Sequence, residues 1–238
     1  MSSLNYTTYV TQLSNLMTYA STDTNFTNFL PGCIDYAEQR SYRDLDLLTT
    51  RVINTAGVLS TNSRTTVLST TTGTFLVVEE YNILTPAGAI SSATRNSVQF
   101  VSKQFIDQTY PSAVLANGVP IWAAMLSDTT ILLGPTPDQP YSAEVIGTIR
   151  PQSLSSANSS TFLTAQLPDL LMAASMIFAT GFMKNFGGQA DNPAMGVSWE
   201  SQYKTLLVSA DTEEARKQYR SQGWTAEQPR AITTPPRV

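Results

Sequence analysis

Two serine-containing motifs are the first candidates for chemistry in this sequence. Ser201 and Lys204 have the Ser-x-x-Lys spacing in which a lysine amine activates a serine hydroxyl for acyl transfer, and Ser127-Asp128-Thr129 loosely matches the second motif of such enzymes. The order of the two motifs is reversed along the chain, the Ser-x-x-Lys pair falls inside an expected helix instead of opening one, and no Lys-Thr-Gly motif is present. The motifs therefore do not indicate an acyl-transfer site.

Other residue types that commonly catalyse reactions or bind metals are scarce. The chain has no histidine, which removes the commonest general base and metal ligand. Its single cysteine, Cys33, excludes an intrachain disulfide and a cysteine-rich zinc site, and we interpret it as a buried structural thiol. Glu79 and Glu80 are expected on opposite faces of a strand, where they could not act as an acid–base pair. Gly187-Gly188 lacks the lysine that follows the glycines of a phosphate-binding loop. We therefore predict a protein that is not an enzyme and has no metal or cofactor.

The tryptophans offer one alternative. Trp122, Trp199 and Trp224 could form an aromatic surface on which a sugar stacks. The first two lie in apolar patterns typical of a protein core, so only Trp224 is expected to be exposed.

The charge balance disfavours tight binding of nucleic acid. The 238 residues include 14 Lys and Arg against 18 Asp and Glu, and a net charge of -4 argues against wrapping DNA through phosphate contacts. Charged residues make up only 13% of the chain, about half the usual share. An acidic surface could still line a channel through which DNA slides, because like charges repel. The first residues lack the basic and apolar regions of a secretory signal, so we expect synthesis and use in a reducing cytoplasm.

Residues 1–49 are predicted to form the N-terminal helices of a bundle. Apolar positions from Tyr6 to Ala20 recur at helical spacing. The segment from Asp23 to Pro31 breaks this pattern and is expected to turn the chain before a second helix from about Cys33 to Leu48. The polar face of that helix is expected to carry the charged residues Glu38, Arg40, Arg43, Asp44 and Asp46.

Residues 50–151 are predicted to form an antiparallel β domain. Short runs rich in β-branched residues alternate with turn-prone segments, which is typical of a sandwich or a small barrel. One hairpin is expected to turn at Ser127-Asp128, and one short helix is expected near Lys103 to Thr109. The predicted strand runs are TRVINTAGVLS, TTVLST, FLVVEEYNIL, SVQFVSK, VPIWAAML, TTILLGP and YSAEVIGTIR.

Residues 152–223 are expected to return to the bundle as two long helices. Pro168 suits the first position of one helix and Asn192-Pro193 the start of the other, while Gly187-Gly188 and Gly223 suit their ends. The run from Leu170 to Met183 is too short to span a bilayer but is apolar nearly all round, so neighbouring copies of the chain are expected to cover it. The candidate subunit-interface residues are Leu170, Met172, Met176, Ile177, Phe178, Phe182, Met183, Trp199 and Tyr203.

Residues 224–238 are predicted to form an extended tail. This segment contains three prolines and too few apolar residues for a core, so it is expected to become ordered only on the surface of a partner. The predicted fold class is therefore α+β: a helical bundle from the N- and C-terminal helices, with an inserted antiparallel β domain and an extended C-terminal tail.

Several blocks of the sequence resemble the head-to-tail adaptor proteins of tailed bacteriophages, also called connector or neck proteins. The blocks follow the same order over nearly the whole chain: IDYAEQRSYRDLDLL, ILTPAG, VIGTIRP, LPDLLMAASMIFATGFMKNFG and SWESQYKTLL. The resemblance implies a structural virion protein that forms a ring, usually dodecameric, docked beneath the portal protein. Such a ring extends the DNA channel, lets DNA pass without sequence-specific binding, and carries tail, nozzle or tail-tube proteins. It is assembled in the host cytoplasm, lies in the neck of the virion and contacts no membrane.

The resemblance also gives the tail a role, because in related adaptors the C-terminal segment reaches onto the portal. The residues expected to contact the portal are Trp224, Gln228, Pro229, Arg230, Ile232, Pro235, Pro236 and Arg237. An alternative interpretation is a tail or baseplate binding module whose β domain recognises a glycan or a fibre partner.

Overall fold

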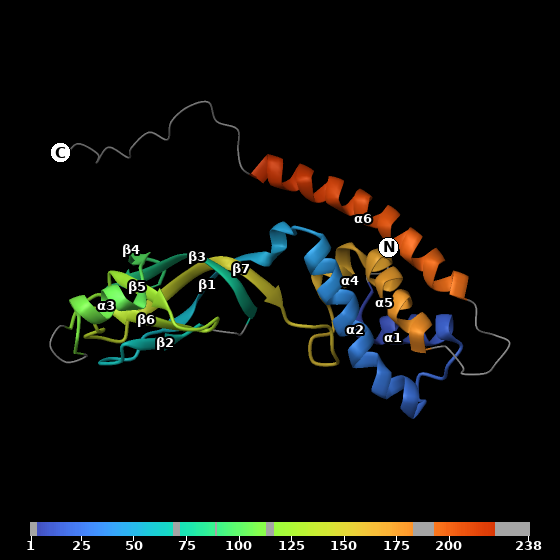
Figure 1. Cartoon of the computed structure of the whole chain (residues 1–238), viewed down its shortest axis with the longest axis horizontal. Helices are drawn as coiled ribbons and strands as arrows, with labels where there is room; N and C mark the ends of the chain where they lie inside the picture. The colour runs from blue at the N-terminus through green and yellow to red at the C-terminus, as the bar shows by residue number, and fades with distance from the viewer. Residues whose placement is uncertain (1–3, 69–71, 89, 113–116, 183–192, 222–238) are drawn as a thin grey trace.

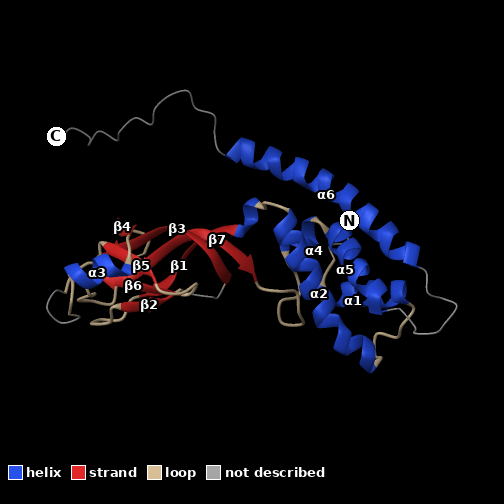
Figure 2. Ribbon diagram, viewed as in Figure 1, coloured by secondary structure: helices blue, strands red, loops and turns tan. Residues whose placement is uncertain are grey.

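The strands, with the short helix α3, occupy one end of an elongated molecule and the other helices occupy the opposite end (Figures 1 and 2). The structure is a computed structural model, and it describes residues 4–68, 72–88, 90–112, 117–182 and 193–221. We call the end that contains α1, α2, α4, α5 and α6 the helical lobe, and the end that contains the strands and α3 the β lobe. Two connectors, residues 45–50 and 152–161, join the lobes. The predicted α+β class is confirmed.

Helices from both ends of the chain build the helical lobe. Their bounds are α1 Tyr6–Met17, α2 Thr24–Asp44, α4 Phe162–Gln166, α5 Pro168–Phe182 and α6 Pro193–Ser221. Buried side chains from all of these helices share one hydrophobic core. The long helix α6 runs along the outside of the lobe, and its C-terminal end points toward the β lobe (Figure 1).

The expected turn between Asp23 and Pro31 is wrong, because α2 begins directly after Asp23. The Asp23 carboxylate accepts hydrogen bonds from the backbone N–H groups of Asn25 at 2.7 Å and Phe26 at 3.3 Å, which caps the helix. Pro31 then lies inside the helix and removes one backbone donor. Phe26 and Leu30 are 0% and 5% exposed, so tertiary packing of this first part of the helix overrides the local penalty.

The β lobe consists of one curled sheet of seven strands in the order β1-β7-β3-β4-β5-β6-β2. Every predicted strand run forms a strand, and the bounds are β1 Arg51–Val58, β2 Thr65–Val67, β3 Gly73–Thr85, β4 Thr94–Phe100, β5 Trp122–Met125, β6 Thr130–Gly134 and β7 Ser142–Pro151. The predicted hairpin joins β5 to β6, and the predicted short helix is α3, Lys103–Thr109.

The sheet is mixed, so the prediction of an entirely antiparallel domain is wrong at one pair of strands. Strands β4 and β5 are parallel, with Gln99 opposite Trp122 and Phe100 opposite Ala123. The chain between these strands passes through α3, and such a crossover lets two neighbouring strands run in the same direction.

The strands nearest the helical lobe form a three-stranded stem, in which β7 pairs with β1 on one side and β3 on the other. Strand β3 shifts register against β7 between Phe75 and Val77 and again between Val78 and Glu80. Gly147 of β7 lies at this irregular stretch, where a Cβ atom would stand 2.2 Å from the Val77 carbonyl oxygen. Glycine therefore permits the close approach of the two backbones.

Candidate assembly site

The residues considered for catalysis are not brought together. Lys204 lies 3.5 Å from Glu200 on α6, whereas Ser127 lies in the β5–β6 turn of the other lobe and accepts the Thr130 N–H at 3.1 Å. Glu79 is paired with Arg51 at 2.7 Å. Over the described ranges, no cluster of three or more His, Cys, Asp or Glu side chains could hold a metal ion. In the same part of the chain, no helix has the length and apolar character needed to cross a membrane.

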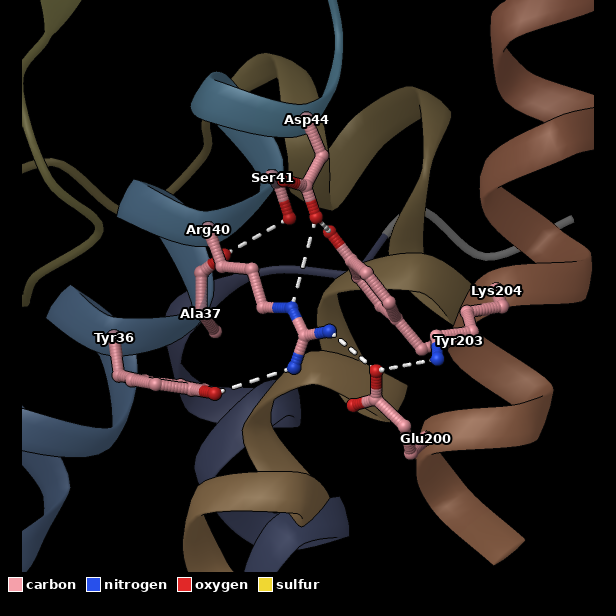
Figure 3. Close-up of polar contacts among 8 residues, drawn as sticks. All are labelled: Tyr36, Ala37, Arg40, Ser41, Asp44, Glu200, Tyr203 and Lys204. Carbon is pink, nitrogen blue, oxygen red and sulfur yellow. Dashed lines mark hydrogen bonds and ion pairs between the residues drawn. The ribbon is translucent and has the colours of Figure 1, made fainter. Parts of the chain in front are cut away.

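A cluster of polar side chains joins α2 to α6 (Figure 3). The Arg40 guanidinium donates to Glu200 Oε1 at 2.7 Å and to the Tyr36 hydroxyl at 3.2 Å, and its Nε lies 3.6 Å from Asp44 Oδ2. The guanidinium carbon also lies 4.3 Å from the centre of the Tyr203 ring, and the Tyr203 hydroxyl donates to Asp44 Oδ2 at 2.8 Å. We call Arg40, Asp44, Glu200 and Tyr203 the α2–α6 clamp.

Helical spacing places the clamp residues, because Arg40 and Asp44 are one turn apart on α2, and Glu200 and Tyr203 lie on one face of α6. The hydrogen bond from Arg40 lowers the pKa of the Glu200 carboxyl. Burial and the neighbouring Asp44 carboxylate raise the pKa of the Tyr203 hydroxyl. At neutral pH Glu200 is therefore charged and Tyr203 protonated, which is the state that this set of hydrogen bonds requires.

The apolar helix α5 is covered mainly by the chain's own helices. Leu170, Met176 and Tyr203 are 1%, 0% and 0% exposed, and they belong to the core that α1, α2, α4, α5 and α6 share. The expectation that neighbouring copies must cover these side chains is corrected accordingly. The sequence showed that α5 is apolar on all sides, but it did not show that α2, α6 and the shorter helices surround it.

One part of α5 reaches the surface beside α2. Phe178 is 38% exposed, and its ring stacks against Phe29 with centroids 5.4 Å apart and against Tyr36 at 5.0 Å. With Ile177 and Gly181 these rings line a shallow apolar groove of about 470 Å³, which we call the aromatic groove. Of the predicted interface residues, Ile177 and Phe178 line this accessible apolar groove.

The remaining predicted site residues fall into two groups. Met172, Ile177 and Trp199 are partly buried against the core of the helical lobe. The side chain of Phe182 and all of Met183 lie outside the described residues. The same holds for every residue predicted to contact the portal: Trp224, Gln228, Pro229, Arg230, Ile232, Pro235, Pro236 and Arg237.

Nearly the whole chain matches one known protein family. A model of the SU10 adaptor protein family matches residues 4–229, which include both lobes and both connectors. The chain belongs to the SU10 adaptor protein family. This is a family of bacteriophage head-to-tail adaptors, so the resemblance found in the sequence is confirmed. None of the curated proteins matches the chain.

Membership of the SU10 adaptor family makes this chain a structural component of a phage virion that interacts with other head and tail proteins. The family is one of structural adaptors and is not known for enzymatic activity. The surfaces that bear on an adaptor role are those that meet other head and tail proteins.

Sequence reasoning missed the burial of two glutamates in the helical lobe. Glu38 was assigned to the polar face of α2, but it is 3% exposed and accepts the Leu154 N–H at 2.9 Å. Burial raises the pKa of its carboxyl. Glu214 of α6 is also 3% exposed. A signal for Glu38 was present, since it lies one turn after the buried Ile34 and so on the same helix face.

Proposed function

We propose that this SU10-family adaptor forms a ring beneath the portal of a tailed bacteriophage, extends the DNA channel and provides the attachment platform for tail components. The family match over residues 4–229 carries this proposal. The ring is dodecameric, in line with the resemblance described above. It lies in the neck of the virion and is assembled in the host cytoplasm.

The separation of the two lobes supports a bridging role. The helical lobe contains α6, which leads directly into residues 222–238, and the β lobe lies at the far end of the molecule (Figure 2). We assign residues 224–238 to binding the portal, and the β domain, residues 50–151, to the tail-side nozzle or tube protein. Residues 1–49 and 152–223 form the helical part of the subunit.

The aromatic groove supports contact between subunits. A ring needs two different surfaces on each subunit, because every copy meets its neighbours head to tail. Phe178 and Ile177 give the groove an apolar surface that the chain's own helices do not cover fully. We assign the groove, together with Met172 and Trp199, which are partly buried against the core of the same lobe, to one side of the subunit contact.

The acidic balance supports passage of DNA through the ring. A net charge of -4 per subunit disfavours binding to phosphates, so DNA could move through the channel in packaging and in ejection without being held.

Electron microscopy of the full chain mixed with portal tests the proposal. A closed ring coaxial with the portal is expected. A variant that lacks residues 224–238 should no longer dock while its helical content by circular dichroism is unchanged, and a variant with a Gly/Ser segment of equal length in that place should behave like the deletion. Docking of the deletion variant would disprove the tail assignment alone, whereas absence of any coaxial ring with the full chain would disprove the adaptor ring.

A second candidate function, a glycan- or fibre-binding module, is favoured by a groove of about 450 Å³ on the β lobe. Its lining includes the polar side chains of Asn96, Gln139 and Tyr141 next to Pro86. Screening the full chain against a glycan array tests this candidate. Saccharide binding that is lost on Gln139→Ala would favour it, and the adaptor proposal expects no such binding.

A further inference from the structure

The two lobes touch through little besides their connectors. Among the described residues, the extensive contacts between elements stay within one lobe, except at the short 3-10 helix η1, Leu48–Thr50, which packs against β7 on one side and α6 on the other. A groove of about 570 Å³ lies beside η1, with a lining of Asp46, Leu47, Leu48, Thr50, Arg51, Glu79, Thr148 and Gln218. So small a contact beside open space does not fix the angle between the lobes by packing, and relative motion is the default for such an arrangement.

Helix α6 holds the first connector through polar contacts to its backbone. Glu214 Oε2 accepts the Leu48 N–H at 3.3 Å, and Gln218 Nε2 donates to the Asp46 carbonyl oxygen at 2.9 Å. Glu214 and Gln218 are one helical turn apart, so the last turns of α6 form hydrogen bonds with the connector at two points. The other carboxylate oxygen of Glu214 accepts a hydrogen bond from Lys217 at 2.7 Å, which compensates its buried charge.

Helix α2 holds the second connector in the same manner. Glu38 Oε1 accepts the Leu154 N–H at 2.9 Å, and the Leu154 side chain is itself buried in the core of the helical lobe. Each of the two chain segments that link the lobes is thus held by one buried glutamate, and in both cases the donor is a backbone N–H. A side-chain change in either connector would leave these bonds in place.

We propose that Glu38 and Glu214 are positioning residues of a joint at η1. While both carboxylates hold their connectors, the helical lobe and the β lobe keep one relative angle. When the bonds are lost, the angle varies while each lobe stays folded, because each lobe has its own hydrophobic core. The C-terminal segment follows α6 directly in the chain, so a partner that binds that segment acts on the joint through Glu214 and Gln218. This last consequence alone rests on the proposed function.

Distance measurements between the lobes test the joint on the isolated full-length chain. In a Cys33→Ala background, spin labels are attached to Gln12→Cys on α1 and Asp128→Cys in the β5–β6 turn, two exposed positions in different lobes. Pulsed electron paramagnetic resonance then gives the distribution of distances between them.

Glu214→Ala is expected to widen this distribution by about twofold or more, because it frees the first connector. Glu213→Ala is the matched control. Glu213 is the neighbouring residue, its side chain is 57% exposed and it also pairs with Lys217, at 2.9 Å, whereas the bond to the Leu48 N–H is made by Glu214. Its distribution should equal that of the parent. Glu38→Ala should act like Glu214→Ala, and the double variant should widen the distribution further.

The proposal is overturned if the double variant, folded by circular dichroism, keeps the parent distribution. Where Glu38→Ala does not fold, Gln218→Ala takes its place with Glu214→Ala, since it removes only a side chain at the surface of α6, and an unchanged distribution overturns the proposal equally. Failure of the ring beneath the portal would not alter these distances, which are measured without any partner.

Discussion

The ion pair between Arg40 and Glu200 should stabilise the docking of α6 by a measurable amount. The perturbation is a double-mutant cycle of Arg40→Met, Glu200→Gln and both together. Methionine keeps most of the aliphatic part of the arginine side chain, and glutamine keeps the shape of the glutamate. The cycle therefore isolates the charge-assisted bond of 2.7 Å between the two side chains.

The exposure of the pair sets the expected magnitude. The side chains of Arg40 and Glu200 are 22% and 30% exposed, so solvent screens their attraction in part. Exposed ion pairs contribute about 0.2–1 kcal/mol and buried hydrogen bonds to charged groups about 1.5–3 kcal/mol, so we expect a coupling energy of about 1 kcal/mol. Arg40→Met alone should cost about 2 kcal/mol, because it also removes the contacts to Tyr36, Asp44 and the Tyr203 ring.

The coupling should depend on pH in one direction. The pKa of Glu200 is lower in the folded chain than its ordinary value of 4.5. Its contribution is therefore fully present above pH 4.5 and is lost as the pH falls through the folded value. Raising the pH from 6 to 8 should leave the coupling unchanged.

Urea unfolding followed by far-UV circular dichroism measures each free energy, since urea adds no salt that would screen the pair. Lys204→Met is the control, because Lys204 also lies near Glu200, at 3.5 Å, but its side chain is 70% exposed. It should cost at most a few tenths of a kcal/mol, about what exposed one-turn pairs contribute. A coupling energy of zero within error at pH 7, or one that grows as the pH falls, would refute the reasoning.

Three further outcomes are expected. Tyr9→Phe should lower the free energy of unfolding in urea by about 1 kcal/mol, because it removes the buried hydroxyl that bonds Ser175 at 2.7 Å; an unchanged midpoint would mean that this bond is not formed. The thiol of Cys33 is buried and its pKa is raised to about 11, so iodoacetamide at pH 8 should modify it only in urea. The contribution of this thiol to the free energy of unfolding should decline as the pH rises from 9 toward 11. Rapid alkylation of the native chain would contradict this account. Phe178→Ser should weaken ring assembly by about tenfold or more in sedimentation velocity, while Val208→Ser, which changes another exposed apolar residue, should not; equal effects would argue against the aromatic groove as the interface.

Local patterns in the sequence predicted the elements well, and long-range packing accounts for what they missed. The strand runs, α3 and the start of α5 at Pro168 follow from β-branched composition, turn residues and helix-start signals, all of which act between near neighbours. The start of α2 was missed because Pro31 is a local signal for a break, whereas the burial of Phe26 and Leu30 is decided by distant helices. The parallel pairing of β4 with β5 depends on how the chain crosses over through α3, which no strand pattern records.

The same difference between local patterns and long-range packing applies to the candidate site. Apolar spacing on α5 identified Phe178 and its neighbours as candidate interface residues. It could not separate the side chains that the chain itself buries from Phe178, which it leaves accessible. The partners of Arg40 on α2 were predictable from the one-turn spacing, since Asp44 follows it by four residues. Its partner on α6 was not, because Glu200 lies 160 positions away along the chain.

The burial of α5 by its own chain changes where the free energy of assembly must come from. Leu171, Ala174 and Met176 are each 0% exposed, so the helical lobe has a complete core before any partner arrives. Burial of these residues, at about 25 cal/mol per Å² of apolar surface, stabilises the subunit and adds nothing to contacts between subunits. The free energy that holds a ring of the proposed kind together must then come from a modest apolar surface at the aromatic groove and from a polar surface poor in charge. The loss of translational freedom on assembly reduces this free energy further. Under the proposed function, the portal therefore has to contribute to ring closure by holding subunits side by side through their C-terminal segments, and α6 is the element that passes this contact to the rest of each subunit.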